Sequence, residues 1–395
     1  MSNVLISGAP PARTAGGLSA TLVLALGTFA VGTDAFVVAG FLPSMAGDLR
    51  VSPATAGQSI TVFAAAYALL SPALATLLAR LPRRTLLVAA LTTLGLANLG
   101  SALAPDMAAL LASRVLAAAG AAAYTPNAGA VSAALVRPEL RARALAVVIG
   151  GLTVATALGV PLGNAASHWL GWRAALGLVA GLCLLVAAVL RAVMPRVAGN
   201  ARVPLRTRLA VLRRPAVLTV LPLTVLGMGA SYTAYAYSVP VLDAVGVGEG
   251  SVPPVLFLYG LGAVIGNLAA GWATDRWGSP AVLTAGYAVL AAALGALAWL
   301  AAARTGAVPT VGPLVLLWGA GSWCQTPPQQ HRLIAAAPQE APLVVSLNSS
   351  AIYAGIGLGT VLGGATLDSG AAVVYGLGAA IAAAALLFLR WSVRR

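Results

Sequence analysis

The sequence predicts an all-α polytopic membrane protein with twelve transmembrane helices in two pseudo-symmetric six-helix bundles. The 395-residue chain is 60% hydrophobic, only 8% of its residues are charged, and its mean hydropathy is +0.93. A soluble domain carries about 25% charged residues, so the composition excludes that class. The apolar stretches are continuous over about twenty residues, as in transmembrane helices, and lack the alternation typical of transmembrane strands.

Glycine, proline and charged residues divide the chain into twelve candidate spans. The first six are predicted at 18–42, 54–78, 85–104, 107–132, 142–165 and 172–194. The second six are predicted at 215–240, 252–273, 280–303, 308–330, 343–366 and 370–390. The first span is too long for the apolar region of a cleaved signal peptide, so it is expected to remain as the first helix. The predicted domains are therefore an N-terminal bundle at 1–194, a basic linker at 195–214 and a C-terminal bundle at 215–395.

Arginine supplies all 23 basic residues, and the formal net charge is +14. A basic patch can indicate nucleic-acid binding, but in a membrane protein an excess of basic residues usually marks the cytoplasmic loops. With the N-terminus inside, nineteen arginines fall on the cytoplasmic side, Arg50, Arg173 and Arg304 fall on the other side, and Arg114 falls within a span. This imbalance predicts a multi-pass protein of the cell membrane with both termini cytoplasmic. It also predicts that the lipid bilayer is a partner of the protein and that nucleic acid is not.

Three local similarities relate the two halves of the chain at offsets of 196 to 201 residues. They pair Thr125-Pro126-Asn127 with Thr326-Pro327-Pro328, Gly159 and Gly163 with Gly359 and Gly363, and Arg80 with Arg276. Consistent offsets indicate a duplicated six-helix unit. Two such units would enclose a cavity between them near the membrane midplane.

These motifs resemble the major facilitator superfamily, and within it the twelve-span drug:proton antiporters. Residues 266–278 resemble the loop signature G-x-x-x-D-R-x-G, and Arg114 followed by Gly120 resembles the motif of the fourth span. Residues 159–163 are similar to the antiporter motif of the fifth span. Residues 32–36 resemble the first-span pattern of the chloramphenicol-resistance and sugar-efflux-like branch. The resemblance covers the whole chain and implies the major facilitator fold.

The first-half copy of the loop signature departs from the family pattern. Ala79 stands where the signature has an acid, and Pro82 where it has glycine. A gating role would therefore rest on the second-half copy, with Gly271, Asp275 and Arg276. The alternative interpretation of this segment is a solvated turn.

The fifth and eleventh spans share a glycine pattern that favours close helix packing. Gly159 and Gly163 flank Pro161, which removes a backbone hydrogen bond and can bend a helix. Gly359 and Gly363 repeat the glycines in the eleventh span. We predict that both clusters serve as hinges between moving helices. The alternative is ordinary small-residue packing.

Asp34 is the one acid of nine that lies well inside a predicted span. A charge in the bilayer centre costs about 2.5–3.5 kcal/mol on insertion scales and must face a cavity or a partner. Asp34 is therefore predicted to carry the coupling proton, unless it lies near the outer interface and is hydrated there. Arg114 is predicted to face the cavity, where its permanent charge could stabilise Asp34 or bind an anionic substrate. The alternatives for Arg114 are snorkelling and a bond to a backbone carbonyl.

The resemblance implies a substrate pocket built from the first, fourth, seventh and tenth spans. The aromatic and amide side chains of these spans are the predicted substrate contacts: Phe36, Tyr124, Asn127, Tyr232, Tyr235, Tyr237, Trp323 and Gln325. Aromatic residues of membrane proteins also form interfacial belts or pack between helices, which is the alternative for each.

The sequence contains no P-loop, no nucleophile–base set and no metal-ligand cluster. We therefore expect no enzymatic activity, no metal and no cofactor, with a proton gradient as the energy source.

The predicted function is proton-coupled export of small, largely uncharged amphipathic compounds by alternating access, with a phenicol antibiotic as one example. The partners are the small-molecule substrate and protons, and the protein is predicted to be a monomer. A sugar or metabolite exporter of the same fold is the alternative. A non-transporting receptor is disfavoured because it would need neither a buried Asp34 nor two repeats around a cavity.

Overall fold

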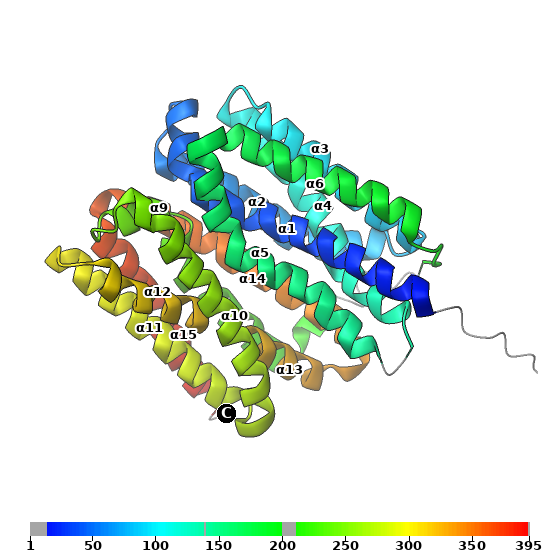
Figure 1. Cartoon of the computed structure of the whole chain (residues 1–395). Coiled ribbons are helices and arrows are strands. Elements are labelled where there is room, and N and C mark those ends of the chain that lie inside the picture. The colour runs from blue at the N-terminus through cyan, green and yellow to red at the C-terminus, as the bar shows by residue number, and fades with distance from the viewer. Residues whose placement is uncertain (1–13, 138–139, 200–210, 394–395) are drawn as a thin grey trace, which may run out of the picture.

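Helices form nearly all of the structure, because backbone groups within a membrane must satisfy their hydrogen bonds internally. The computed structural model describes residues 14–137, 140–199 and 211–393, and no β-strand occurs within them (Figure 1). Eleven of the described helices are long and apolar enough to cross a membrane. The predicted all-α polytopic class is confirmed.

Six long helices make up the first half of the chain. They are α1 (Thr14–Leu49), α2 (Pro53–Leu77), α3 (Arg83–Ala102), α4 (Met107–Ala134), α5 (Arg141–Leu170) and α6 (Trp172–Val193). Each corresponds to a predicted span, although α1 continues beyond its predicted end at residue 42. It bends at Phe41, whose φ and ψ are −117° and 15°, because Pro43 cannot donate to the preceding turn.

The described part of the second half, residues 211–393, contains eight α-helices and four short 3₁₀ helices. The α-helices are α8 (Pro215–Tyr235), α9 (Ser238–Asp243), α10 (Val252–Trp277), α11 (Ser279–Ala303), α12 (Val308–Trp323), α13 (Thr326–Ala336), α14 (Ala341–Thr366) and α15 (Ala371–Val393). The 3₁₀ helices are η2 (Val211–Arg213), η3 (Glu249–Ser251), η4 (Pro338–Glu340) and η5 (Leu367–Ser369).

Two predicted spans of the second half are each divided into two helices. The prediction of one uninterrupted helix over 308–330 was wrong, because α12 ends at Trp323 and α13 begins at Thr326. Pro327 and Pro328 cannot donate to the carbonyls of the preceding turn, so the helical ladder is interrupted there. The seventh span is similarly divided between α8 and the short α9.

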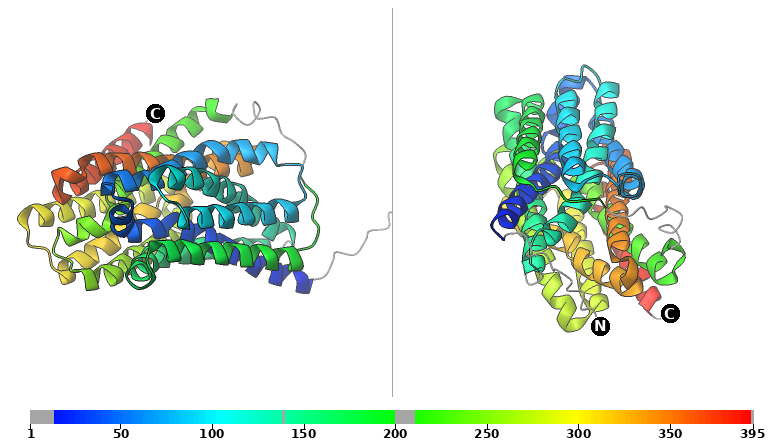
Figure 2. Two further views of the ribbon diagram at one scale, coloured as in Figure 1. Left: turned by 90° about the horizontal axis from the view of Figure 1, so that it is seen from above. Right: turned by 90° about the vertical axis from the view of Figure 1, so that its right-hand side faces the viewer.

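The two halves repeat the same set of helix contacts. In the first half α1 packs on α5 and α6, α3 packs on α4 and α6, and α2 packs on α4. In the second half α8 packs on α14 and α15, α11 packs on α12 and α15, and α10 packs on α12. This equivalence confirms two pseudo-symmetric bundles, which Figure 2 shows from two further directions. The halves meet where α2 packs against α14 and α5 against α10.

The basic linker predicted at 195–214 falls mainly on residues outside the described part of the chain. The structure describes the end of α6 and the start of η2 on either side of residues 200–210. The predicted domain boundaries at 194 and 215 therefore stay a prediction.

Close backbone contacts hold α1 against α5. Gly159 lies against Phe36, and Gly163 lies against the backbone of Val37, so a Cβ at either glycine would collide with α1. The helix α5 continues through Pro161 to Leu170. In the second half Gly359 and Gly363 lie in the same way against α8. These glycines serve close packing in both halves, and their predicted hinge role stays a prediction.

We expect Gly163→Val to lower the free energy of unfolding by about 1–3 kcal/mol, because the added side chain overpacks the α1–α5 contact. Thermal unfolding in detergent measures the change. Gly177→Val is the matched control, because a Cβ at Gly177 meets nothing within 4 Å. Equal melting temperatures for the two variants would contradict the close-packing role of Gly163.

Candidate functional site

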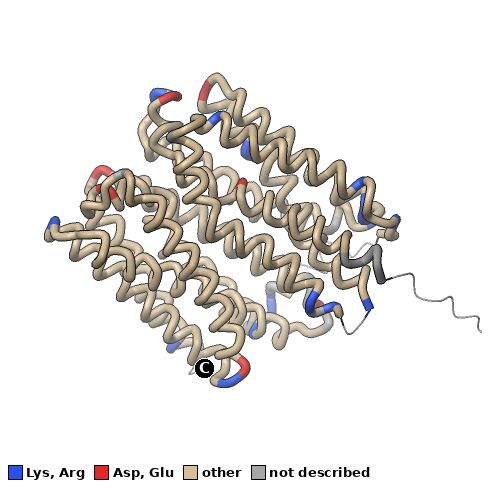
Figure 3. Tube along the Cα trace, in the orientation of Figure 1, with Lys and Arg blue, Asp and Glu red and all other residues tan. Residues whose placement is uncertain are grey.

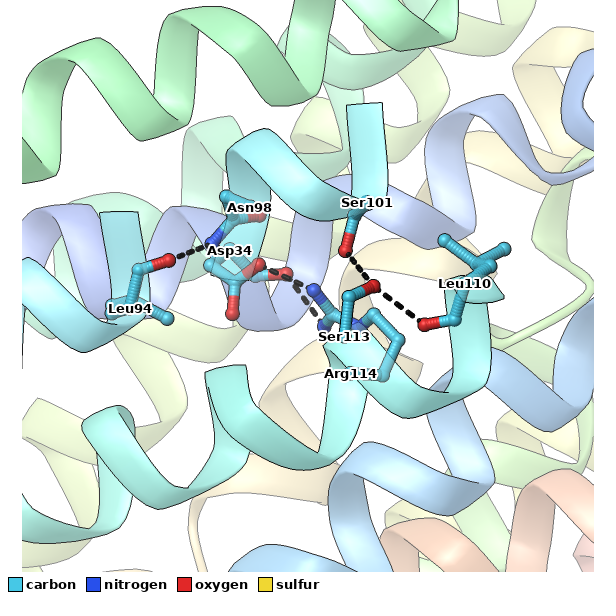
Figure 4. A network of polar contacts seen from close by, with 7 residues as sticks. All are labelled: Asp34, Leu94, Asn98, Ser101, Leu110, Ser113 and Arg114. Atoms are coloured by element: carbon cyan, nitrogen blue, oxygen red, sulfur yellow. Dashed lines mark hydrogen bonds and ion pairs between the residues drawn. The ribbon is translucent and has the colours of Figure 1, made fainter. Parts of the chain in front are cut away.

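A fully buried ion pair joins α1 to α4. Arg114 Nη1 lies 2.6 Å from Asp34 Oδ1, and Arg114 Nη2 lies 3.5 Å from the Asp34 backbone carbonyl (Figure 4). Asp34 is 0% exposed and Arg114 is 1% exposed. Elsewhere in the described chain, the ion pairs Arg173–Asp48 and Arg214–Glu340 are partly exposed. Two charges in apolar surroundings must be well paired to be retained, and these two are in direct contact.

The buried pair keeps unused hydrogen-bonding capacity. Asp34 Oδ2 and Arg114 Nε have no hydrogen-bond partner. Asn98 of α3, also drawn in Figure 4, donates through Nδ2 to the Leu94 carbonyl at 3.0 Å, and its Oδ1 has no partner. Since a carboxylate bonded through one oxygen can take up a proton on the other, Asp34 can be protonated without a rearrangement of its contact to Arg114.

Hydroxyl groups connect α3 and α4 next to Arg114. The Ser101 and Ser113 hydroxyls lie 2.7 Å apart, and Ser113 donates to the Leu110 carbonyl at 2.7 Å (Figure 4). Because Ser113 has one hydroxyl proton and directs it to Leu110, Ser101 donates to Ser113. These bonds position the turn of α4 that carries Arg114.

One aromatic ring lies against the Arg114 guanidinium group, and two further rings pack on that ring. The Arg114 Cζ lies 4.5 Å from the centroid of the Phe63 ring of α2. The rings of Phe63 and Tyr67 both contact Tyr353 of α14, with centroid distances of 5.9 Å and 3.8 Å. The Tyr67 and Tyr353 rings are stacked, with an interplanar angle of 26°. A continuous set of contacts therefore connects the ion pair of the first half with a helix of the second half.

A cavity of about 570 Å³ lies between the two halves. Residues of α1, α4 and α5 line one side, and residues of α10, α12, α13 and α14 line the other. The lining is predominantly apolar, and none of the described side chains that line it is charged. Asn267 Oδ1 and Thr326 Oγ1 belong to lining residues and have no hydrogen-bond partner.

The cavity lies toward the arginine-rich end of the bundle, at which α4 and α10 end and α5 and α14 begin. Figure 3 shows most of the arginines at this end. Thr28 of α1 lines the cavity, and Asp34 lies about 9 Å farther along the helix axis, at about 1.5 Å per residue. The ion pair is not part of the cavity lining.

One of the predicted substrate contacts, Trp323, lines the cavity. Its ring makes an edge contact with Phe36 of α1 at a centroid distance of 6.0 Å. Phe36 itself is buried and is not part of the lining. The two residues connect the halves at the inner limit of the cavity.

The other predicted substrate contacts of the fourth and tenth spans form hydrogen bonds with other residues of the protein. Tyr124 donates its hydroxyl to the Leu24 carbonyl at 3.0 Å. Asn127 accepts a hydrogen bond from Arg83 Nη1 at 2.7 Å. Gln325 Oε1 accepts one from the Tyr287 hydroxyl at 3.1 Å. None of the three lines the cavity in this conformation.

The three tyrosines predicted in the seventh span are buried within the second half. Tyr232 and Tyr235 form an edge contact at 5.0 Å, and Tyr235 packs on Tyr259 at 4.4 Å. Tyr237 donates to the Thr360 carbonyl of α14 at 3.0 Å. The structure does not bring these rings to the cavity, and their contact with substrate stays a prediction.

The predicted gating residues lie in the last turns of α10. Asp275 and Arg276 are exposed, and the Arg276 Cζ lies 5.7 Å from the Trp272 ring centroid. No ion pair with Asp275 occurs in the described part of the chain. A Cβ at Gly271 would meet nothing within 4 Å, so no close contact requires glycine there. Gly278, with φ of +80°, follows the end of the helix. The gating role of this segment stays a prediction.

Comparisons with known proteins agree with this architecture. The family model described as Major Facilitator Superfamily matches residues 24–341. The inner membrane transport protein YdhP of Escherichia coli (strain K12) is 33% identical over 377 residues, covering 95% of this chain and 96% of that protein. A chloramphenicol resistance protein of Streptomyces lividans is 34% identical over 351 residues, covering 87% of this chain and 88% of that protein. A bacterial homologue of the human lysosomal transporter Spinster, solved in an inward-facing and unoccupied conformation, superposes with a TM-score of 0.71 at 18% identity over 96% of each chain.

Proposed function

The chain belongs to the major facilitator superfamily of membrane transporters, and on that premise we propose that it is a proton-coupled exporter of small amphipathic compounds. The observation that carries this proposal is the buried Asp34–Arg114 pair, which lies outside the cavity lining. Proton-coupled alternating access requires a group that gains a proton on one side of the membrane and loses it on the other. Asp34 has the burial and the free carboxylate oxygen that such a group needs.

Proton and substrate would be linked through the charge of the pair. Deprotonated Asp34 and Arg114 together carry no net charge, and protonation leaves the net positive charge of Arg114 in the core. A substrate that binds better to one protonation state must change the proton affinity of Asp34 by the same free energy, because the coupling is reciprocal. Export follows if the proton is taken up outside and released inside.

The cavity supports small, largely uncharged substrates. Its volume falls within the roughly 300–1,000 Å³ typical of small-molecule sites. The N-terminus of α13 reaches the cavity, but Pro327 and Pro328 carry no N–H group to bind an anion there. The similarity to a chloramphenicol resistance protein supports an antibiotic among the substrates. The mainly apolar lining favours such compounds over the sugars of the alternative function.

Reconstitution into proteoliposomes tests the function. An acid interior should drive accumulation of chloramphenicol, used as the probe, and a protonophore should abolish it. Adding chloramphenicol to the purified protein in weak buffer should release protons. Accumulation that persists with the protonophore would refute proton coupling, and accumulation of glucose in place of chloramphenicol would favour a sugar exporter.

The arginine distribution predicts that the segment carrying Arg202 is cytoplasmic. We expect an impermeant maleimide to leave Arg202→Cys unlabelled in intact cells and to label it after permeabilisation. Thr305→Cys, in the loop between α11 and α12, should be labelled in intact cells. Both variants are made after replacing Cys183 and Cys324 with Ala, since these are the chain's two cysteines. The reverse labelling pattern would show that the orientation is wrong.

A further inference from the structure

The two halves of the transporter touch through aromatic rings directly beside the buried ion pair. We define the ring cluster as Phe63 and Tyr67 of α2 with Tyr353 of α14. Phe63 and Tyr67 are 2% and 1% exposed, so their rings are held by surrounding atoms. Tyr353 is the member from the second half, and it contacts both of the others.

We propose that the ring cluster transmits the protonation state of Asp34 to the contact between α2 and α14. This inference rests on the proposed function in one respect, namely that Asp34 gains and loses a proton during transport. It assigns Phe63 and Tyr353 as positioning residues, which act through Arg114 and do not contact the substrate.

The physical basis is competition between Asp34 and Phe63 for the guanidinium group. Arg114 lies 2.6 Å from the carboxylate and 4.5 Å from the ring centroid. While Asp34 is ionised, its negative charge cancels much of the field that Arg114 exerts on the ring. Protonation removes that charge, and the ring face becomes the main partner of the cation. A desolvated cation–aromatic contact changes an equilibrium constant by about five- to thirtyfold.

The α2–α14 contact is the part of the structure that the change in the Arg114–Phe63 interaction would affect. It is one of the two most extensive helix contacts between the halves, and it extends from Ser71 and Ser346, 3.4 Å apart, past the ring cluster to Gly357 beside Ala64. Because alternating access moves one half against the other, this contact must rearrange during the cycle. The rings are assembled in the present structure, whose cavity lies at the arginine-rich end. Protonation of Asp34 should therefore favour this conformation.

Few other groups can give a competing response to pH at this site. Besides Arg114, Cys183 of α6 and Tyr353 of α14 are titratable side chains near enough to be affected by the charge of Asp34. Tyr67 of α2 lies behind Tyr353, and α5 packs on this part of α1 through Gly159 and Gly163. Thiol and phenol groups are ordinarily neutral near pH 7, so neither adds a charge beside the ion pair.

The test measures the pH response of the conformational equilibrium in full-length protein in nanodiscs. Spin labels at Pro105→Cys and Thr305→Cys report the separation of the two halves at the end opposite to the arginine-rich end, in the background without Cys183 and Cys324. In the parent protein, lowering the pH should increase the population with the short separation. Phe63→Leu and Tyr353→Leu should each reduce that shift by about five- to thirtyfold. Tyr353→Phe keeps the ring and should retain the shift.

Two controls separate coupling from general damage. Phe388→Leu removes a ring of α15 that contacts Trp391 and not the ion pair, so the parent response should persist. In the Asp34→Asn background, Tyr353→Leu should change nothing further in the pH response. A wild-type pH response in both Phe63→Leu and Tyr353→Leu would overturn the inference. If Asp34→Asn itself retains the response, the proposed proton coupling fails as well; if Asp34→Asn loses it and the leucine variants keep it, only the inference on the rings is wrong.

Discussion

Asp34→Asn is expected to abolish uphill export and to leave a folded protein. Asparagine has nearly the same volume, and its carbonyl oxygen can still accept a hydrogen bond from Arg114 Nη1, now 2.6 Å from Asp34 Oδ1. It cannot release a proton, so the site would remain fixed in the charge state of protonated Asp34. Gradient-driven accumulation of chloramphenicol in proteoliposomes should fall to the level of empty vesicles. Substrate-induced proton release should disappear.

Binding and downhill exchange of substrate are expected to survive in Asp34→Asn, because Asp34 does not line the cavity. Asp48→Asn is the matched control on the same helix. Its side chain is 54% exposed and bonds Arg173 at the surface, so export should be retained. Undiminished uphill export by Asp34→Asn would mean that another group carries the proton, or that protons do not drive transport.

Arg114→Met is expected to destabilise the protein strongly. The substitution leaves Asp34 buried without its cation, and removing one partner of a buried pair typically costs about 3–5 kcal/mol. Thermal unfolding in detergent should show a large loss. Arg173→Met breaks an ion pair that is 41% exposed on the arginine side, for which about 0–1 kcal/mol is expected.

The double variant Asp34→Asn/Arg114→Met distinguishes a charge effect from lost packing. Removing both charges eliminates the unpaired carboxylate, so most of the stability should return, and the coupling free energy of the double-mutant cycle should be large. If the double variant is as unstable as Arg114→Met alone, packing of the arginine side chain against Phe63, and not the ion pair, accounts for the loss.

The fold was predictable because transmembrane helices need long apolar segments, and the two halves repeat their motifs. The break between α12 and α13 was missed because Pro327 and Pro328 are tolerated in membrane helices when neighbours satisfy the freed carbonyls. Sequence pattern alone does not show whether such neighbours are present.

The candidate site was predictable in part. Asp34 and Arg114 are distinctive because charges are rare within spans. The sequence could not show that Tyr124 and Tyr237 lie away from the cavity. Each donates a hydrogen bond to a backbone carbonyl of a helix that is distant in sequence, and the sequence does not reveal such a contact. Asn267, a polar residue that lines the cavity, was missed because the sequence does not show that its side chain lies at the cavity.

Phe63 and Tyr353 were missed because the sequence does not show how close an aromatic ring within a span lies to a guanidinium group. Arg83, which is 8% exposed and donates to Asn127, was counted only as a loop charge. The position of Arg83 at the start of a helix gave no sign in the sequence of this packing contact with Asn127.

The division of the tenth span has a consequence for how the chain enters the bilayer during synthesis. α12 has 16 residues and α13 has 11, and the latter include His331 and Arg332. Insertion of a self-sufficient helix requires about 20 apolar residues, so neither piece meets that length alone. α13 packs on α8, α10, α11 and α14, of which the last is made after it. We therefore expect stable insertion of this segment to depend on its packing against those four helices.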